Sequence, residues 1–570
     1  MRTLGLRDIV GPIMVGPSSS HTAGALRIAA MTRALLDRPP ADVTFTLYGS
    51  FSRTYRGHGT DRALVAGLLG LAADDLRIRD SFRLADEAGL TYRFEVDPRT
   101  KTRHPNTVDL RVTDVDGDML EVRGESIGGG AARLVRVDGF NVDLTGEYSA
   151  LIVYQCDKPG TLGFLATTLG EHDINIGSVL LFRNHRGGHA FNVLEVDNPV
   201  PQEVLDLIAA DGRVSRVRLM PAADLAERDA EDTEVAGEES KDEALALGPA
   251  EAEACFRKVD FEDGAALLAY AESQGMTLGR AFLAREDLRL AMQGQGGHSS
   301  CAYLRRALGV MRESVRAPLS QTPQTMGGLI GGEARLLGGL LASGGAGVGG
   351  TGAAGPEGKV PGVSQTAGQA PDVYTCAAAY AMAVLETNAS MGRIVAAPTA
   401  GAAGVVPGVL FALQEEQGLS DDALADALAT AAAVGYIVTR NATVAGAEGG
   451  CQAEMGTASA MAAAAAVQLQ GGSPRQALTA AAIALTNMLG LVCDPVGGLV
   501  EEPCQKRNAS AAANALVSAQ MALAGVASTA PFDETVDAMR RVGAVLPMEL
   551  RETALGGIAT CASCVARCTR

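Results

Sequence analysis

Residues 221–250 divide the chain into two parts of different character. This segment carries many charged side chains, most of them acidic, and few large apolar ones, so it cannot bury enough surface to form a core of its own. We expect it to be a solvated linker. At 570 residues the chain also exceeds the size that one hydrophobic core can organise. The sequence therefore predicts a multidomain protein with a boundary at residues 221–250.

Residues 1–145 combine helical and strand patterns. An apolar helical run at residues 23–36 is ended by a pair of prolines. Val43, Phe45 and Leu47 then alternate with threonines, a period of two that is typical of a half-buried strand. We predict an α+β domain here.

Residues 148–220 show strand and helix patterns in the order βαββαβ. That order is found in ferredoxin-like folds. With the run Asp157-Lys-Pro-Gly-Thr-Leu162 at the first strand-to-helix turn, the segment resembles an ACT domain, a module that commonly senses amino acids. A purely structural or dimerising module would show the same pattern, and both interpretations stay open.

Residues 251–570 are predicted to form an all-α domain, because helical patterns follow one another without a convincing period of two. Long Ala runs indicate closely packed helices. The most apolar stretch, Ala477–Val492, contains Thr and Asn and is shorter than a membrane span, so we expect a buried helix. The Gly-rich stretch Ser343–Gln369 is predicted to be a long inserted loop.

Charge and cysteine content narrow the function. A net charge of −18 argues against a nucleic-acid partner or an anionic membrane surface, since phosphates would be repelled. The N-terminus shows no signal-peptide pattern, so we expect a cytoplasmic protein. Ten cysteines are too few for a disulfide scaffold in a chain of this length, and in a reducing compartment clustered thiols are more often ligands or nucleophiles.

Three cysteines in the helical part each lie beside Gly or Pro, where helices break: Cys451, Cys493 and Cys504. Thiolates at such turns can converge on one point, and nearby backbone N–H groups can donate to the sulfurs of a cluster. The spacing alone favours inert core cysteines, which are the commoner fate of a cytosolic cysteine.

Longer motifs surround these cysteines. They are Asn388-Ala-Ser-Met-Gly-Arg-Ile-Val-Ala-Ala-Pro-Thr-Ala-Gly401, Glu448-Gly-Gly-Cys451 and Cys493-Asp-Pro-Val-Gly-Gly-Leu-Val-Glu-Glu-Pro-Cys504, together with Gly16-Pro-Ser-Ser-Ser-His-Thr-Ala-Gly24 and Gly57-His-Gly-Thr-Asp61 near the N-terminus. In these motifs the chain resembles the bacterial iron-sulfur L-serine dehydratases, in a single-chain form with an ACT-like domain. The resemblance spans nearly the whole chain.

The resemblance implies a lyase that converts L-serine to pyruvate and ammonia without pyridoxal phosphate. It implies a 4Fe-4S cluster held by Cys451, Cys493 and Cys504, whose iron without a protein ligand acts as a Lewis acid for the substrate hydroxyl while a base removes the Cα proton. It also implies that a C-terminal cysteine can occupy this iron at rest. Cys564 lies nearest the family position, with Cys561 and Cys568 as the other candidates.

The same resemblance makes His21 and His58 candidate catalytic residues, since an imidazole can transfer a proton or hydrogen-bond the substrate carboxylate. Which of the two is the base stays open. Hydroxyls and free N–H groups at Ser18–Ser20 suit a carboxylate, as do the unshielded amides that follow Ser126. The candidate substrate-binding residues are Ser18, Ser19, Ser20, Thr60, Asp61, Ser126, Gly128 and Gly129.

Two other functions would use some of the same features. A pyridoxal-phosphate dehydratase would need a Schiff-base lysine beside a phosphate-binding loop, and Lys506 follows no Gly-rich loop. A redox or amino-acid sensor would use the cluster and the ACT-like module for regulation.

Beyond the substrate L-serine, we expect a regulatory serine at the ACT-like module and a homodimer. L-Threonine stays open as a secondary substrate, because one methyl group changes specificity by only about 1–3 kcal/mol.

Overall fold

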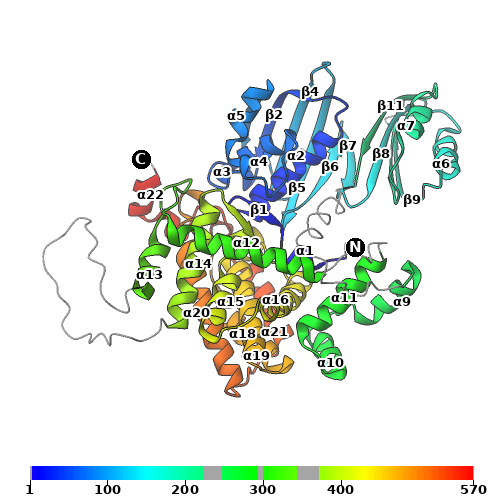
Figure 1. The fold of residues 1–570 in the computed structure, drawn as a ribbon. Helices are drawn as coiled ribbons and strands as arrows, with labels where there is room; N and C mark the ends of the chain where they lie inside the picture. The colour runs from blue at the N-terminus through cyan, green and yellow to red at the C-terminus, as the bar shows by residue number, and fades with distance from the viewer. Residues whose placement is uncertain (1–2, 184, 223–246, 293–299, 343–371, 569–570) are drawn as a thin grey trace. The chain divides into compact units, whose positions relative to one another are not determined.

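The computed structural model describes residues 3–183, 185–222, 247–292, 300–342 and 372–568. The chain separates into two compact units, one formed by Ser20–Glu231 and the other by Met1–Ser19 together with Asp232–Arg570 (Figure 1). Most of the predicted acidic linker and all of the predicted loop at Ser343–Gln369 lie outside the described residues. The prediction of an α+β N-terminal part and a helical C-terminal part is confirmed.

The first unit contains a six-stranded sheet in the order β3-β2-β4-β5-β6-β7, in which only β2 and β3 pair in parallel. Its strands are β2 (Pro40–Tyr48), β3 (Thr91–Asp97), β4 (Thr107–Asp114), β5 (Met119–Gly128), β6 (Ala131–Val137) and β7 (Phe140–Leu144). Inward-facing residues such as Val43, Phe45 and Leu47 are fully buried, which confirms the alternation predicted for this strand.

Helices α2 (Gly24–Ala34) and α4 (Thr60–Leu68) pack against each other, and α2 contacts β5 and β6 (Figure 1). Two glycines permit this close approach. A Cβ atom on Gly67 would lie 2.4 Å from the carbonyl oxygen of Leu26, and one on Gly124 would lie 2.2 Å from Ile28. The backbone of α2 is therefore fixed tightly between its neighbours, and α2 follows directly on the loop that carries His21.

Residues 149–220 form a four-stranded antiparallel sheet in the order β11-β8-β10-β9, and the predicted order βαββαβ is confirmed. The elements are β8 (Ser149–Cys156), α6 (Thr161–Glu171), β9 (Ile176–Arg183), β10 (His189–Val196), α7 (Gln202–Ala209) and β11 (Val214–Met220). Buried Leu151, Val153, Leu165 and Leu169 form part of the core between sheet and helices.

This second sheet packs against the rest of its unit. The ring of Phe191 stacks on that of Phe140 at 4.6 Å, and the guanidinium of Arg218 donates a hydrogen bond to the carbonyl oxygen of Leu35. Arg218 is a buried cation, 2% exposed, and this hydrogen bond offsets part of the cost of its burial. Residues 149–220 are therefore joined to the first part of the unit by a buried interface.

The other unit is a stack of helices. They are α9 (Pro249–Val259), α10 (Gly264–Gln274), α11 (Leu278–Met292), α12 (Ser300–Ser320), α13 (Glu333–Ala342), α14 (Val373–Ala389), α15 (Val405–Gln417), α16 (Asp421–Asn441), α17 (Gly446–Gly449), α18 (Thr457–Leu469), α19 (Pro474–Thr486), α20 (Cys504–Leu523), α21 (Phe532–Val545) and α22 (Ala562–Cys568). Helix α18 lies at the centre, packed against α15, α16, α19 and α20 (Figure 1).

Small side chains allow this dense packing. Ala458 and the run Ala460–Val467 on α18 are fully buried. Helix α19 confirms the buried helix predicted at Ala477–Val492 as far as Thr486, whereas the residues after Thr486 are not helical. Helix α16 is long and apolar enough to cross a membrane, but 78% of its most apolar window is buried inside the protein. It is a core helix of this unit, with burial on nearly every side.

The first 19 residues belong to the helical unit. Strand β1 (Ile13–Val15) pairs antiparallel with β12 (Arg393–Val395), and Tyr303 donates a hydrogen bond of 2.6 Å to the carbonyl oxygen of Val10. The predicted all-α domain thus contains one short strand pair. Three-residue strands are too short to show a period of two, which is why the sequence pattern missed them.

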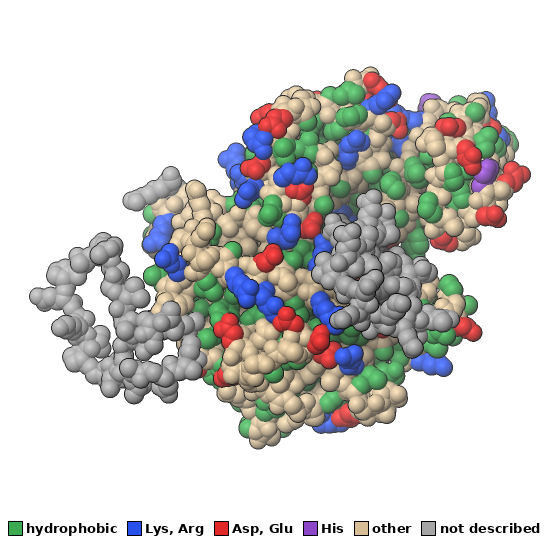
Figure 2. Space-filling view, viewed as in Figure 1, with side chains coloured by type: hydrophobic (Ala, Val, Ile, Leu, Met, Phe, Trp, Pro, Cys, Tyr) green, Lys and Arg blue, Asp and Glu red, His purple; other side chains and the backbone are tan. Residues whose placement is uncertain are grey.

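On the face shown in Figure 2, Lys and Arg side chains are interspersed with Asp and Glu.

Candidate functional site

Cys451, Cys493 and Cys504 all lie in the helical unit and are 1%, 5% and 8% exposed. Cys451 follows the short helix α17, Cys493 lies in the loop after α19, and Cys504 is the first residue of α20. Burial raises the pKa of Cys451 to about 12 and raises those of the other two well above the usual value, with further contributions from neighbouring acidic groups. Cys493 and Cys504 each feel the charge of Cys451, so the structure brings the three thiols together.

The donor set fits an iron-sulfur cluster. Three buried sulfur donors suit a thiophilic group.

Two carboxyl groups lie beside the thiols, that of Glu454 partly buried and that of Glu552 buried, and no sequence motif pointed to either. Oε2 of Glu454 is 4.0 Å from Sγ of Cys493, and its Oε1 accepts a hydrogen bond of 2.9 Å from Thr399. Burial raises the pKa of Glu454 to about 7. Burial, and then the charge of Glu454, raise the pKa of Glu552 well above its usual value. A carboxyl three residues after Cys451 was the one available indication in the sequence.

Space around Glu454 is kept open by glycine. A Cβ atom on Gly446 would lie 2.6 Å from Oε2 of Glu454 and 3.3 Å from Sγ of Cys493. A Cβ atom on Gly401 would lie 3.2 Å from the other carboxylate oxygen. A side chain at either glycine would enter the space around Glu454, and one at Gly446 would also approach the thiol of Cys493. This open space fits a bound group, as do the three buried sulfur donors.

The C-terminal segment runs along the Cys493 loop. The N–H of Cys493 donates to the carbonyl oxygen of Leu550, and the N–H of Glu552 donates to the carbonyl oxygen of Cys493, both at 2.9 Å. Asp494, 2% exposed, accepts a hydrogen bond of 2.8 Å from the N–H of Ile558. The tail is thus attached to the loop at several points.

Beyond this attachment lie the three tail cysteines. Cys561 and Cys568 are exposed and Cys564 is half-buried. Sγ of Cys568 would lie 2.6 Å from a Cβ atom on Gly497, so Cys568 lies against the loop that begins at Cys493. The choice of Cys564 as the resting fourth ligand stays a prediction.

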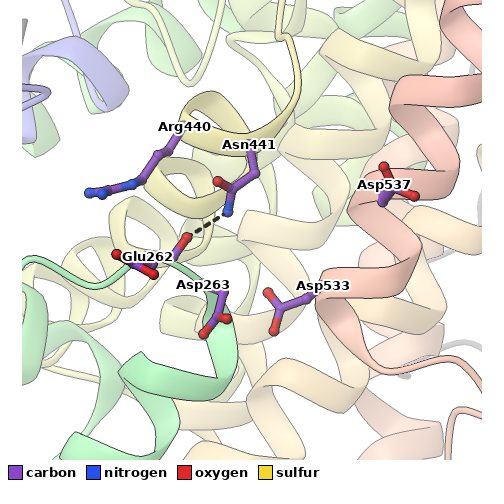
Figure 3. Close-up of a pocket in the computed structure, with 6 residues that line it drawn as sticks. All are labelled: Glu262, Asp263, Arg440, Asn441, Asp533 and Asp537. Carbon is purple, nitrogen blue, oxygen red and sulfur yellow. Dashed lines mark hydrogen bonds between the residues drawn. The ribbon is translucent and has the colours of Figure 1, made fainter. Parts of the chain in front are cut away.

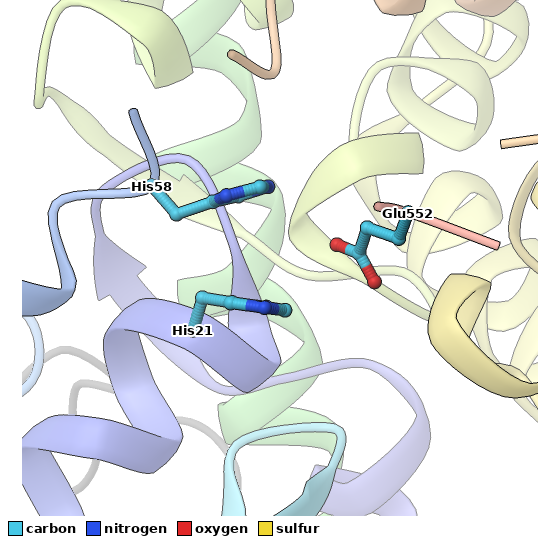
Figure 4. Close-up of side chains that lie close together, drawn as sticks. All are labelled: His21, His58 and Glu552. Atoms are coloured by element: carbon cyan, nitrogen blue, oxygen red, sulfur yellow. The ribbon is translucent and has the colours of Figure 1, made fainter. Parts of the chain in front are cut away.

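In the α+β unit, His21 and His58 form a stacked pair with ring centroids 4.4 Å apart (Figure 4). His21 is held by Ser50, at 2.9 Å from Nε2, and by Ser20, at 3.0 Å from Nδ1. Nδ1 of His58 lies 3.3 Å from the carbonyl oxygen of Thr54. The helical turn Ser19–Ala23, which precedes α2, and the turn that precedes α4 bring these two imidazoles together.

Both imidazoles are fully buried. Burial lowers the pKa of His58 to about 4. Burial, then the charges of His58 and His104, lower the pKa of His21 well below its usual value. Both rings are therefore neutral near pH 7, and a neutral imidazole is able to accept a proton.

The remaining predicted residues divide between the two units. Ser126 donates a hydrogen bond of 2.6 Å to the carbonyl oxygen of Ser20, which joins those two loops. Thr60 and Asp61 begin α4 and are buried, and burial raises the pKa of Asp61 to about 6. Gly128 and Gly129 end β5 with φ of +100° and +58°, where other residues are strained. Ser18 and Ser19 are buried and belong to the helical unit.

An open pocket of about 480 Å³ lies elsewhere in the helical unit, and none of the predicted site residues lines it. Figure 3 shows its six lining residues, among them Asp533, Arg440 and Asn441. Asp533 accepts hydrogen bonds from the N–H groups of Gly264 and Ala265 at the start of α10, and Asn441 donates to the carbonyl oxygen of Glu262. These polar groups therefore hold the ends of neighbouring helices together through hydrogen bonds.

Comparison with known proteins identifies two regions. The family model of the serine dehydratase alpha chain matches residues 235–559, and that of the serine dehydratase beta chain matches residues 8–134. The first match contains the three buried cysteines, and the second contains the histidine pair. The beta-chain and alpha-chain regions thus follow one another in one polypeptide.

Individual relatives agree with these matches. The chain is 56% identical to the probable L-serine dehydratase alpha chain of Bacillus subtilis (strain 168) over 31% of its own length and 60% of that protein. It is 53% identical to the L-serine dehydratase alpha chain of Peptoniphilus asaccharolyticus over 33% of its length and 64% of that protein. It is 39% identical to the probable beta chain of the same Bacillus strain, over 36% of its length and 93% of that protein. The aligned region thus spans slightly less than two thirds of both alpha chains and nearly all of the beta chain.

Proposed function

Because the chain belongs to the serine dehydratase family, we propose that it is an L-serine dehydratase that forms pyruvate and ammonia from L-serine. The observation that carries this proposal is the convergence of three buried thiols within the region that matches the alpha chain. A lyase of this kind must labilise a hydroxyl, a poor leaving group, and remove a weakly acidic Cα proton. The two requirements call for an electrophile and a base.

We assign the electrophile to a 4Fe-4S cluster held by Cys451, Cys493 and Cys504. Bound through three thiolates, such a cluster supplies an iron without a protein ligand as a Lewis acid for the substrate hydroxyl. Cys564 is the tail cysteine that we assign to that iron at rest. Support comes from the burial of the three thiols and from Gly446, which leaves room beside Cys493.

The base is one of His21 and His58. Their low pKa values leave both rings neutral at neutral pH, so either can take the Cα proton while the other donates a hydrogen bond to the substrate. Loss of that proton and of the hydroxyl leaves aminoacrylate, which tautomerises to an imine and hydrolyses to pyruvate and ammonia.

The substrate's charged groups need partners as well. Hydroxyl and N–H groups of the serine and glycine loops suit the carboxylate, and the carboxyl of Asp61 suits the ammonium. The residues proposed to bind substrate are Ser18, Ser19, Ser20, Thr60, Asp61, Ser126, Gly128 and Gly129.

We also propose that the chain consists of four regions: an α+β domain at residues 1–145, an ACT-like module at 148–220 that binds regulatory L-serine, an acidic linker at 221–250 and a catalytic domain at 251–570. The antiparallel strand order β11-β8-β10-β9 supports the ACT-like assignment.

The edge strand β9 carries three consecutive exposed apolar side chains, at Val179, Leu180 and Leu181, which supports pairing with a second copy in a homodimer. We propose a cytoplasmic location, which would keep the ten free thiols reduced.

Replacement of each cluster cysteine tests the proposal. Cys451→Ser, Cys493→Ser and Cys504→Ser should each abolish pyruvate formation from L-serine and the charge-transfer absorption at about 400 nm after anaerobic reconstitution. Cys255→Ser on α9 is the matched control and should leave both unchanged. Full activity in all three variants would refute the assignment.

A further inference from the structure

Arg507 lies among the three segments that carry the buried cysteines. It follows Cys504 by three residues on α20, so the two side chains lie on the same face of the helix. Its side chain is 16% exposed, which is unusual for an arginine unless its donors are satisfied. No sequence motif considered above assigned it a role.

The guanidinium reaches both neighbours of Cys493. Nη1 donates a hydrogen bond of 2.8 Å to the carbonyl oxygen of Val492 and lies 2.8 Å from Oδ1 of Asp494. Because these two residues flank Cys493, the position of the Cys493 thiol depends on where the guanidinium is held.

The same side chain also lies near the other two cysteines. The negative groups that act on the charge of Arg507 are Cys451, Asp494 and Cys504. The guanidinium therefore contacts the residues on either side of Cys493 and lies close enough to Cys451 and Cys504 for their charges to interact with it.

Arginine suits this position better than lysine. Its planar guanidinium presents five donors in fixed directions, so it can serve a carbonyl, a carboxylate and a sulfur at once. Apart from Arg507, the charged groups described above beside the thiols, Glu454, Asp494 and Glu552, are all acidic. A cluster on three thiolates adds further negative charge, and a nearby cation offsets it.

We propose that Arg507 is the positioning residue that holds the three cysteines in place for the cluster and offsets the cluster's negative charge. The inference rests on the proposed cluster. It adds a residue that does not touch substrate and that acts through the ligands. Two consequences follow: Arg507 sets how firmly iron is retained, and it sets the reduction potential.

The two consequences are separated by two variants. Arg507→Gln removes both the charge and the fixed donors. Arg507→Lys keeps the charge but loses the planar guanidinium with its donors in fixed directions. Changes in the surroundings of metal ligands typically cost about 10- to 100-fold in metal affinity. In both variants the chelator concentration that removes half of the iron should fall by about that factor. The midpoint potential should fall in Arg507→Gln only, because a lost positive charge disfavours reduction.

The measurements are iron and sulfide per chain, chelator titration, and midpoint potential by electron paramagnetic resonance, on the full chain reconstituted without oxygen. Arg312→Gln is the matched control, since Arg312 pairs with Asp421 on another part of the helical unit. Should Arg507→Gln fail to fold, Arg507→Lys still tests iron retention against this control.

The outcomes distinguish the two proposals. Variants of Arg507 that match Arg312→Gln in iron retention and potential would overturn the role of Arg507 and leave the proposed function standing. A wild-type chain that takes up no cluster would overturn both.

Discussion

The backbone N–H of Glu552 donates a hydrogen bond of 2.9 Å to the carbonyl oxygen of Cys493. The N–H of Cys493 donates one of the same length to Leu550, so the C-terminal segment and the Cys493 loop hold each other on both sides. The tail is thus part of the structure that fixes one of the three thiols. A change that loosens the tail should therefore affect the site.

Asp494→Ala should loosen the attachment of the C-terminal segment to the Cys493 loop. The change removes the ion pair with Arg507 and the acceptor for the N–H of Ile558, and it leaves a mostly buried guanidinium without its counter-ion. Breaking a buried pair in this way costs about 3–5 kcal/mol. We expect a lower melting temperature and faster proteolysis after residue 555 in the iron-free chain. Asp537→Ala is the control, because it removes an exposed partner of Arg540 and should change the melting temperature and the rate of proteolysis only a little.

Gly446→Ala should reduce cluster uptake, because the added methyl would lie 2.6 Å from Glu454 and 3.3 Å from the thiol of Cys493. Overpacking of this kind costs about 1–3 kcal/mol. The control is Gly309→Ala on α12, where nothing lies within 4 Å and the helix should gain about 0.5–1 kcal/mol. Iron per chain after reconstitution is the readout. Equal iron content in the two variants would contradict the placement of the site.

Acid should destabilise the α+β unit through the histidine pair. The pKa of His58 is about 4 in the folded chain and about 6.5 when unfolded, so the unfolded state binds more protons between these values. Stability is therefore lost as pH falls from about 7 to 4, by up to about 3 kcal/mol for this residue.

His58→Asn should flatten that dependence, as seen in melting temperatures at pH 7 and 5. The exposed His189 gives a control variant, His189→Asn, which should keep the wild-type slope. An unchanged slope in His58→Asn would show that burial of His58 does not disfavour its charged form.

Charges on strand β9 should separate the proposed dimer. Val179→Lys combined with Leu181→Lys places two cations on the exposed edge of the four-stranded sheet. Sedimentation velocity should then give the mass of a single chain. Val115→Lys, at another exposed apolar position between β4 and β5, should leave the dimer intact. A dimeric double variant would exclude β9 as the interface.

Local patterns predicted most of the fold. The alternation at Val43–Leu47 became β2, the order βαββαβ was found, and the Ala-rich stretches became buried helices, since periodicity records which faces are buried. The pairing of β1 with β12 was missed because it joins residues 380 positions apart through strands of three residues. Such long-range contacts leave no trace in a local pattern.

The site was predicted in part. The motifs identified the three cysteines and the two histidines, and the structure buries all five. Glu454, Glu552 and Arg507 were missed, because a charged residue in a sequence is usually exposed and only the tertiary structure shows that Glu552 is buried, and Glu454 and Arg507 partly buried, near the thiols. Their roles depend on contacts between segments far apart in the chain.

The most direct test is a set of assays on one anaerobic preparation of the wild-type chain: iron, acid-labile sulfide, bound pyridoxal, and pyruvate formed from L-serine. We predict about four iron and four sulfide per chain, no pyridoxal, and pyruvate formation that disappears in air in parallel with the absorption at about 400 nm. Full pyruvate formation by a chain that lacks iron or carries pyridoxal would contradict the proposal, as would a full cluster content with no pyruvate formed.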